Sequence, residues 1–94
     1  MTALHTIPPP HAKGLNGKFS CPCCGAFTLK ERSIFSICPV CFWEDDGTVD
    51  ENEGWGPNRT SLAKARANFK EFGSCDKDML KFCRKAQPEE LEAQ

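Results

Sequence analysis

Four cysteines occur in two pairs whose spacing suits a metal ion. Two residues separate Cys21 from Cys24, and two separate Cys38 from Cys41. This spacing allows a tight turn that presents both sulfurs to one ion, while backbone N–H groups in the turn can donate to the thiolates. Four thiolates in a tetrahedral array suit zinc or a single iron and leave no open position for water. The spacing therefore predicts one closed metal site holding one Zn²⁺ per chain, with iron as the alternative.

Cys23 lies inside the first pair and competes with Cys24 for a ligand position. Two residues between ligands is the favoured spacing, and Gly25 after Cys24 tolerates the left-handed backbone that such a turn needs. Pro22 fixes φ within the same turn. These features favour Cys24 as the ligand. Cys23 is then expected to be an inert thiol, with replacement of Cys24 or a redox role as the alternatives.

The remaining cysteines and both histidines are expected to lie outside the metal site. Cys75 and Cys83 belong to the helical part of the sequence, where free cysteine commonly serves as a small buried apolar side chain. His5 and His11 lie in the proline-rich N-terminal segment, and neither is expected to bind metal. The predicted ligands are therefore Cys21, Cys24, Cys38 and Cys41.

An acidic stretch at residues 44–53 contains no basic residue. It lacks the alternating ligands, central glycine and distal glutamate of an EF-hand loop, so a calcium site is not predicted. Asp45 and Asp46 are instead expected to accept hydrogen bonds from backbone N–H groups or to pair with Arg59 or Arg66. The simplest interpretation of the rest of the stretch is a solvated loop.

The chain is too short to bury a large apolar core. It has 94 residues, enough for one domain whose core supplies only a few kcal/mol of stability. The N-terminus lacks the pattern of a signal peptide, and no apolar run reaches about 20 residues. We therefore expect a cytoplasmic protein that does not enter a membrane. In a reducing compartment, an odd total of seven cysteines favours metal binding over disulfides.

The element order predicts a small α+β metal-stapled domain. Residues 26–29 and 33–37 are rich in β-branched and aromatic residues, and we expect them to pair across a turn at 30–32 as a zinc-ribbon-like or rubredoxin-like knuckle hairpin. Two short helices should follow, at about 61–72 and 76–85. Thr60 or Ser61 can cap the first helix and Gly73 can end it.

The domain boundaries follow from composition. Residues 1–18 contain three consecutive prolines and are predicted to form an extended or disordered arm. Residues 19–87 form the single predicted domain, and residues 88–94 an acidic tail. Trp43 and Trp55 are expected to belong to the core.

Several motifs occur in a fixed order along this domain. They occupy residues 21–25, 38–46, 56–58, 62, 65–66, 68–69 and 72–73. Together they resemble the cysteine-rich CPCC family, a group of small, mostly bacterial proteins. The resemblance implies zinc binding and supplies no catalytic residues. Some members of the family are encoded near bacterial toxin genes, which implies an immunity or antitoxin role.

A closed four-sulfur site is ordinarily structural, because it has no position at which to activate water. We therefore expect a zinc-binding protein that is not an enzyme and acts as a protein-interaction module. An immunity protein that neutralises a bacterial toxin is a specific alternative. A rubredoxin-like iron electron carrier, or a thiol redox protein acting through Cys23, is the alternative from another class. The net charge of −1 does not favour nucleic-acid binding in general. The basic residues on the predicted helices nevertheless keep nucleic-acid binding as a third hypothesis.

Overall fold

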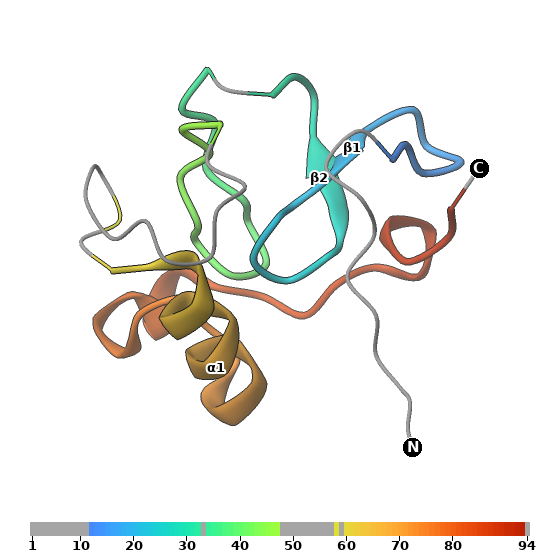
Figure 1. Cartoon of the computed structure of the whole chain (residues 1–94). Coiled ribbons are helices and arrows are strands. Elements are labelled where there is room, and N and C mark those ends of the chain that lie inside the picture. The colour runs from blue at the N-terminus through green and yellow to red at the C-terminus, as the bar shows by residue number, and fades with distance from the viewer. Residues whose placement is uncertain (1–11, 33, 48–57, 59, 94) are drawn as a thin grey trace.

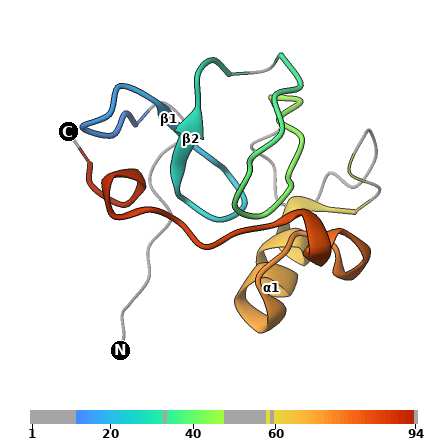
Figure 2. The same ribbon diagram turned by 180° about the vertical axis from the view of Figure 1, so that it is seen from behind.

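A computed structural model of the chain describes residues 12–32, 34–47, 58 and 60–93. Its elements, in chain order, are β1 (Phe19–Ser20), β2 (Phe27–Leu29), α1 (Leu62–Phe72) and two 3₁₀ helices, η1 (Lys77–Phe82) and η2 (Pro88–Glu90). Two cysteine loops, the first at residues 21–24 and the second at residues 38–41, lie side by side, with α1 packed beneath them (Figure 1). The C-terminal segment runs back past both loops towards β1, as the reverse view shows (Figure 2).

Each cysteine pair stands at the end of its own hairpin. β1 and β2 pair in an antiparallel sense on either side of the first loop. On either side of the second loop, Ile37 forms an antiparallel bridge with Glu44. The predicted pairing of residues 26–29 with 33–37 is therefore wrong. Each cysteine loop is closed by its own backbone hydrogen bonds, from the Cys21 N–H to the Ala26 carbonyl and from the Cys38 N–H to the Trp43 carbonyl, which bring the segments on its two sides together.

A buried ion pair connects the two hairpins. Arg32 follows β2, and its Nε donates to Oδ2 of Asp45 at 2.7 Å while Nη2 donates to Oδ1 at 3.2 Å. Asp45 is fully buried and also accepts from the Gly47 N–H at 3.1 Å. The expected backbone hydrogen bond to Asp45 is confirmed, but Arg32 is a partner that the sequence did not predict. Arg59 lies outside the described residues.

Local capping signals set both ends of α1. Ser61 is the N-cap, and its Oγ accepts from the Lys64 N–H at 3.1 Å. Gly73 ends the helix in the left-handed conformation, with φ of 95°, and its N–H donates to the Phe69 carbonyl. The start of α1 is its most buried part, where Leu62 packs in the same core as the cysteines.

The second predicted helix, at 76–85, is a short 3₁₀ helix instead. η1 covers only Lys77–Phe82, and Asp76 caps its start by accepting from the Asp78 N–H at 2.9 Å. No residue of η1 is buried, and Cys83 ends it with extended backbone. Helices of this length depend on tertiary packing of one apolar face. The apolar residues of η1 are too closely spaced to form such a face.

The predicted arm (1–18) and tail (88–94) both contain residues that pack onto the domain. Gly14 is buried, and a Cβ at this position would lie 2.5 Å from Cγ of Phe27. Glu90 is buried as well. An antiparallel bridge joins the two segments, and η2 contacts β2. The described parts of both segments therefore belong to the folded domain.

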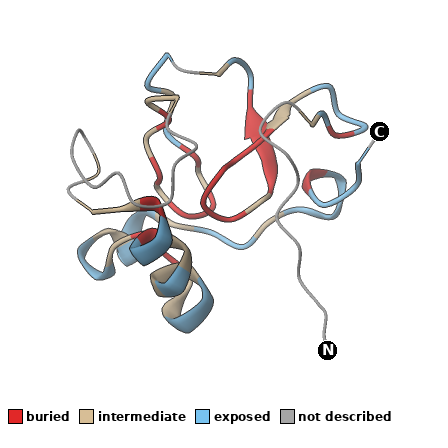
Figure 3. Cartoon of the chain, viewed as in Figure 1, coloured by how far each residue is buried: buried red, intermediate tan, exposed pale blue. Residues whose placement is uncertain are grey.

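The core is centred on the cysteine loops. Buried residues gather on both loops and on β2, whereas most of the surface of α1 is exposed (Figure 3). Trp43 is 2% exposed, so its predicted burial is confirmed, while Trp55 lies outside the described residues. Among the residues described, no helix has the length and apolar character needed to cross a membrane. The apolar core is thus small, and half of its buried residues are cysteines.

The ion pair between Arg84 and Glu90 predicts a pH-dependent contribution to stability. The guanidinium donates two hydrogen bonds to the carboxylate, at 2.8 and 2.9 Å. These bonds lower the pKa of Glu90. Glu90→Gln should therefore lower the free energy of unfolding by about 1–2 kcal/mol at neutral pH. Because the folded pKa is the lower one, the contribution is present above the usual glutamate pKa and is lost as pH falls through the folded value.

Denaturant unfolding of the wild type and Glu90→Gln at several pH values measures this difference. Glu89→Gln is the matched control, because Glu89 is exposed and its change should leave stability nearly unaltered. A difference between wild type and Glu90→Gln that stays constant from neutral to strongly acidic pH would contradict the assignment.

Candidate metal centre

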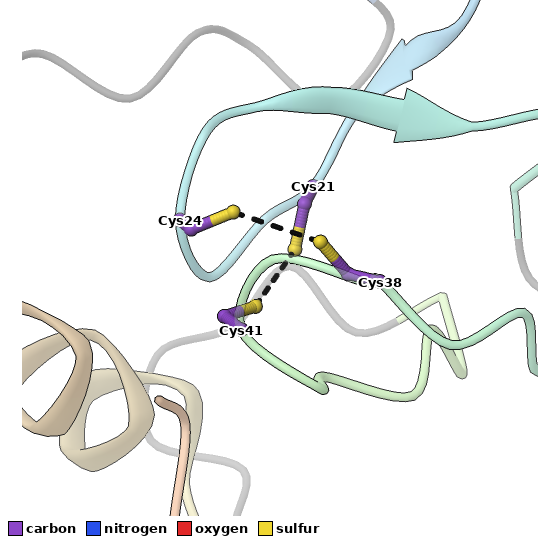
Figure 4. Close-up of side chains that lie close together, drawn as sticks. All are labelled: Cys21, Cys24, Cys38 and Cys41. Atoms are coloured by element: carbon purple, nitrogen blue, oxygen red, sulfur yellow. Dashed lines mark hydrogen bonds between the residues drawn. The ribbon is translucent and has the colours of Figure 1, made fainter. Parts of the chain in front are cut away.

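The sulfur atoms of Cys21, Cys24, Cys38 and Cys41 converge on one point. All four Sγ atoms lie within 4.8 Å of one another, and all four residues are buried. Cys21 and Cys24 project from the first loop and Cys38 and Cys41 from the second, so that the pairs face each other (Figure 4). The structure thus brings together the four residues that the spacing predicts.

The sulfur separations fit a tetrathiolate metal site. The Sγ atoms of Cys21 and Cys41 are 3.6 Å apart, and those of Cys24 and Cys38 are 3.7 Å apart. A tetrahedral ion with metal–sulfur bonds near 2.3 Å requires about 3.8 Å between sulfurs. A disulfide requires about 2.05 Å. The cluster therefore has the dimensions of a site for one metal ion, and these four cysteines would be its ligands.

The two cysteine loops have the same backbone hydrogen bond and a similar left-handed residue after the second cysteine. In the first, the Gly25 N–H donates to the Cys21 carbonyl; in the second, the Phe42 N–H donates to the Cys38 carbonyl, both at 2.8 Å. Gly25 has φ of 82° and Phe42 has φ of 70°. The left-handed region costs a phenylalanine about 1–2 kcal/mol. The Phe42 ring stacks on Phe82 with centroids 5.3 Å apart, a contact that offsets part of this cost.

Two hydrogen-bond donors contact sulfurs of the cluster. The Thr28 hydroxyl donates to Cys38 Sγ at 3.0 Å, and the Cys23 N–H donates to Cys21 Sγ at 3.4 Å. Four thiolates around a divalent ion carry a net charge of about −2, which such donors stabilise. Thr28 belongs to β2 and Cys38 to the second loop, so this hydrogen bond also ties the two hairpins together.

A cation from α1 is anchored beside the first loop. Nε of Arg66 donates to the Pro22 carbonyl at 2.8 Å, between the two cysteines of that loop. The helix therefore supports the metal-binding turn through a charged hydrogen bond. Neither Thr28 nor Arg66 was assigned to the site from the sequence. The signal for Thr28 was its place on the strand that leaves the first loop, whereas nothing local in the sequence linked Arg66 to Pro22.

Burial and sulfur contacts set the protonation of the cluster. Burial is the main cause that raises the pKa of the Cys21 and Cys41 thiols. Hydrogen bonds from the other three cysteines, with a smaller one from Thr28, lower the pKa of Cys38. A metal ion must therefore displace protons from buried thiols, and its affinity should fall as pH falls.

The other cysteines lie outside the cluster. Cys23 is buried and is not one of the four clustered cysteines. Its N–H donates to Cys21 Sγ, and a hydrogen bond with its side chain helps to raise the pKa of Cys41. Cys75 is buried as predicted, and its burial raises the pKa of its thiol to about 12, which makes it unreactive. Cys83 is only half-buried, and its thiol donates to the Met79 carbonyl at 3.4 Å. His5 and His11 lie outside the described residues.

Fold and site together define a small cysteine-rich domain whose four-sulfur cluster could hold a metal ion. Comparison with protein families matches residues 19–90 to the family described as Cysteine-rich CPCC. The chain therefore belongs to this family, as the resemblance in sequence predicts. The matched segment contains all four clustered cysteines and extends to the buried Glu90. No curated protein matches the chain.

Single serine substitutions test the ligand set. Cys21→Ser, Cys24→Ser, Cys38→Ser and Cys41→Ser should each abolish tight metal binding and markedly destabilise the fold, because a closed site contributes about 10 kcal/mol to folding. Cys23→Ser should retain both properties, since the Cys23 sulfur is not one of the four that converge. Metal content and denaturant unfolding measure the outcome. The assignment is wrong if Cys23→Ser behaves like the ligand variants while Cys24→Ser does not.

Thr28→Val tests the hydrogen bond to the cluster. The substitution keeps the shape of the side chain and removes the donor to Cys38 Sγ, so metal affinity should fall by about tenfold. Competition with a chromophoric chelator measures this affinity. Thr60→Val is the matched control, because it makes the same chemical change outside the cluster and should leave affinity unchanged. Equal affinities for Thr28→Val and the wild type would contradict the role given to Thr28.

Proposed function

We propose that this protein binds one zinc ion through Cys21, Cys24, Cys38 and Cys41, performs no catalysis and acts as a protein-interaction module. The observation that carries the proposal is the enclosure of the sulfur cluster. Three of the cysteines are 0% exposed and Cys24 is 5% exposed. Such a site supplies four ligands and no accessible position for a substrate or an activated water, which is the pattern of structural zinc.

The size of the core supports a structural role. The strands have only two and three residues, and the apolar core is built around the loops that hold the sulfurs. Zinc binding by four thiolates contributes about 10 kcal/mol of folding free energy, which a core of this size needs. The ion would fix the two hairpins against each other and against α1.

Exposed apolar side chains support an interaction role. Ile34, Phe35 and Ile37 are 53%, 56% and 46% exposed and lie on the segment that leads into the second loop. Small soluble domains rarely expose several large apolar residues together unless the surface has a partner. Neutralisation of a bacterial toxin is one specific form of such binding, and its support is the resemblance noted in the sequence analysis. Nucleic-acid binding has weaker support, because the chain is slightly acidic.

Redox chemistry is the competing class. An iron carrier would keep one edge of the cluster near solvent, and the low exposure of all four cysteines therefore favours zinc. Colour separates the two, since a ferric tetrathiolate is red and zinc is colourless. Elemental analysis of natively purified protein should find one zinc per chain. Less zinc accompanied by iron would overturn the proposal.

Metal removal tests whether the ion stabilises the fold. Trp43 is buried and directly follows the second loop, so its near-ultraviolet circular dichroism should report the packing of that loop. Complete chelation should abolish this signal and unfold the domain, and added zinc should restore both. A native spectrum after complete removal of metal would contradict the structural role.

A pull-down from the native cell tests the interaction role. Zinc-loaded protein should capture a specific partner, and chelated protein should lose it because the binding surface is no longer held in place. Failure to capture any protein at native concentrations, with the zinc site shown to be loaded, would overturn this part of the proposal.

A further inference from the structure

An apolar groove lies where the end of α1, η1 and the extended segment 83–87 meet. Its volume is about 360 Å³, within the range of pockets that hold ligands. Apolar side chains from all three elements and from the second loop line it. They include Val40, Phe69, Phe72, Leu80 and Ala86. None of these residues is one of the four clustered cysteines.

The groove is attached to the rigid part of the molecule. Val40, one of its lining residues, lies between Cys38 and Cys41 and is 3% exposed. The Arg84 N–H donates to the carbonyl of Pro39 in the same loop at 3.2 Å. The metal-binding loop therefore holds one wall of the groove directly, and the shape of the groove depends on the loaded metal site.

The charge around the groove is positive. Arg84 and Lys85 line it, and no acidic side chain does. The guanidinium of Arg84 is already paired with Glu90, whereas the ammonium of Lys85 has no ion pair within the described part of the chain. An occupant with carboxylates beside an apolar side chain would complement this lining.

Backbone groups beside the groove are also open to a partner. The segment between Cys83 and Gln87 is extended at both ends, with ψ of 157° and 154°. Within the described residues, the Lys85 N–H and both backbone groups of Ala86 make no hydrogen bond. A second extended chain could pair with these groups while placing a side chain in the groove.

We propose that this groove binds an extended acidic peptide segment of a partner protein, with one aromatic or aliphatic side chain seated between Phe72 and Leu80. The proposal rests on the interaction role given above and assigns that role a surface. It favours a peptide over a folded apolar surface because the open backbone groups and the unpaired Lys85 recognise main chain and carboxylate. The half-exposed Leu80, 44% accessible, extends the apolar surface at the groove.

Synthetic peptides and the zinc-loaded full-length protein provide the test. The probe is an acetylated, amidated peptide with a central Leu-Phe pair flanked by two glutamates on each side. Two control peptides replace the glutamates by lysines or the Leu-Phe pair by Ser-Ser. Amide resonances at Phe72, Gly73, Lys85 and Ala86 should shift on titration with the acidic Leu-Phe peptide, and both controls should bind at least about tenfold more weakly.

Two protein variants place the binding at the groove. Lys85→Glu should weaken the acidic peptide by about tenfold or more and improve binding of the lysine peptide, with no loss of fold because Lys85 is exposed. Leu80→Asp should abolish the binding of both the acidic peptide and the lysine peptide. Lys77→Glu is the matched charge control, since Lys77 is exposed on η1 but does not line the groove. Shifts at other residues, or affinities that Lys85→Glu leaves unaltered, would overturn the proposal.

A second copy of this chain is the competing occupant. Leu91 is 63% exposed and lies between Glu89 and Glu92, so it carries the same acidic and apolar chemistry. If a second copy is the occupant, the protein should self-associate with rising concentration, and Leu91→Asp and Leu80→Asp should each abolish this association. A mixture of the two variants should restore it, because one variant keeps the groove and the other keeps Leu91. That result would assign the groove to the second copy and contradict the proposal of a different partner protein.

The experiments distinguish failure of the groove assignment from failure of the general interaction role. If Lys85→Glu and Leu80→Asp still capture the cellular partner in full, the groove assignment fails and the interaction role stands. If the acidic peptide binds at the groove but no partner is captured from the cell, the groove is shown to bind acidic peptides, whereas the interaction role and the assignment to a partner protein fail.

Discussion

The convergence of four cysteine sulfurs is the constraint on which the rest of the structure depends. Each pair occupies a tight loop closed by its own backbone hydrogen bonds, and each loop is anchored by short strand pairing. These elements are too small to be stable alone. Leu62 and Ala65 of α1 pack in the core that forms where the two loops meet. The cluster therefore acts as the centre of the core as well as the candidate metal site.

Polar contacts across the loops make that meeting specific. Arg32 and Asp45 join the segment after β2 to the segment after the second loop, and Thr28 reaches from β2 to Cys38. Each contact bridges the two hairpins, so a shift of one hairpin would leave a buried charge or hydroxyl unpaired, at a cost of about 1–3 kcal/mol. The sulfur geometry and this polar network favour the same arrangement.

The features that the sequence could predict are those with local causes. The cysteine spacing and Gly25 pointed to the cluster, and the Ser61 and Gly73 signals match the ends of α1. The strand pairing could not be predicted, because segment 34–37 has the composition of a strand whether it pairs with β2 or across its own loop. The packing of Gly14 on Phe27 and of Glu90 on Arg84 joins distant parts of the chain, and composition alone placed both residues outside the domain.

The proposed function requires a single zinc ion that is held by four thiolates and nothing else. X-ray absorption at the zinc edge of natively purified protein tests this most directly, since it reports the number, type and distance of the ligand atoms. The proposal predicts four sulfur scatterers at about 2.3 Å and no nitrogen or oxygen ligand. A spectrum that requires a nitrogen or oxygen neighbour, or only three sulfurs, would contradict the closed site and reopen the question of catalysis.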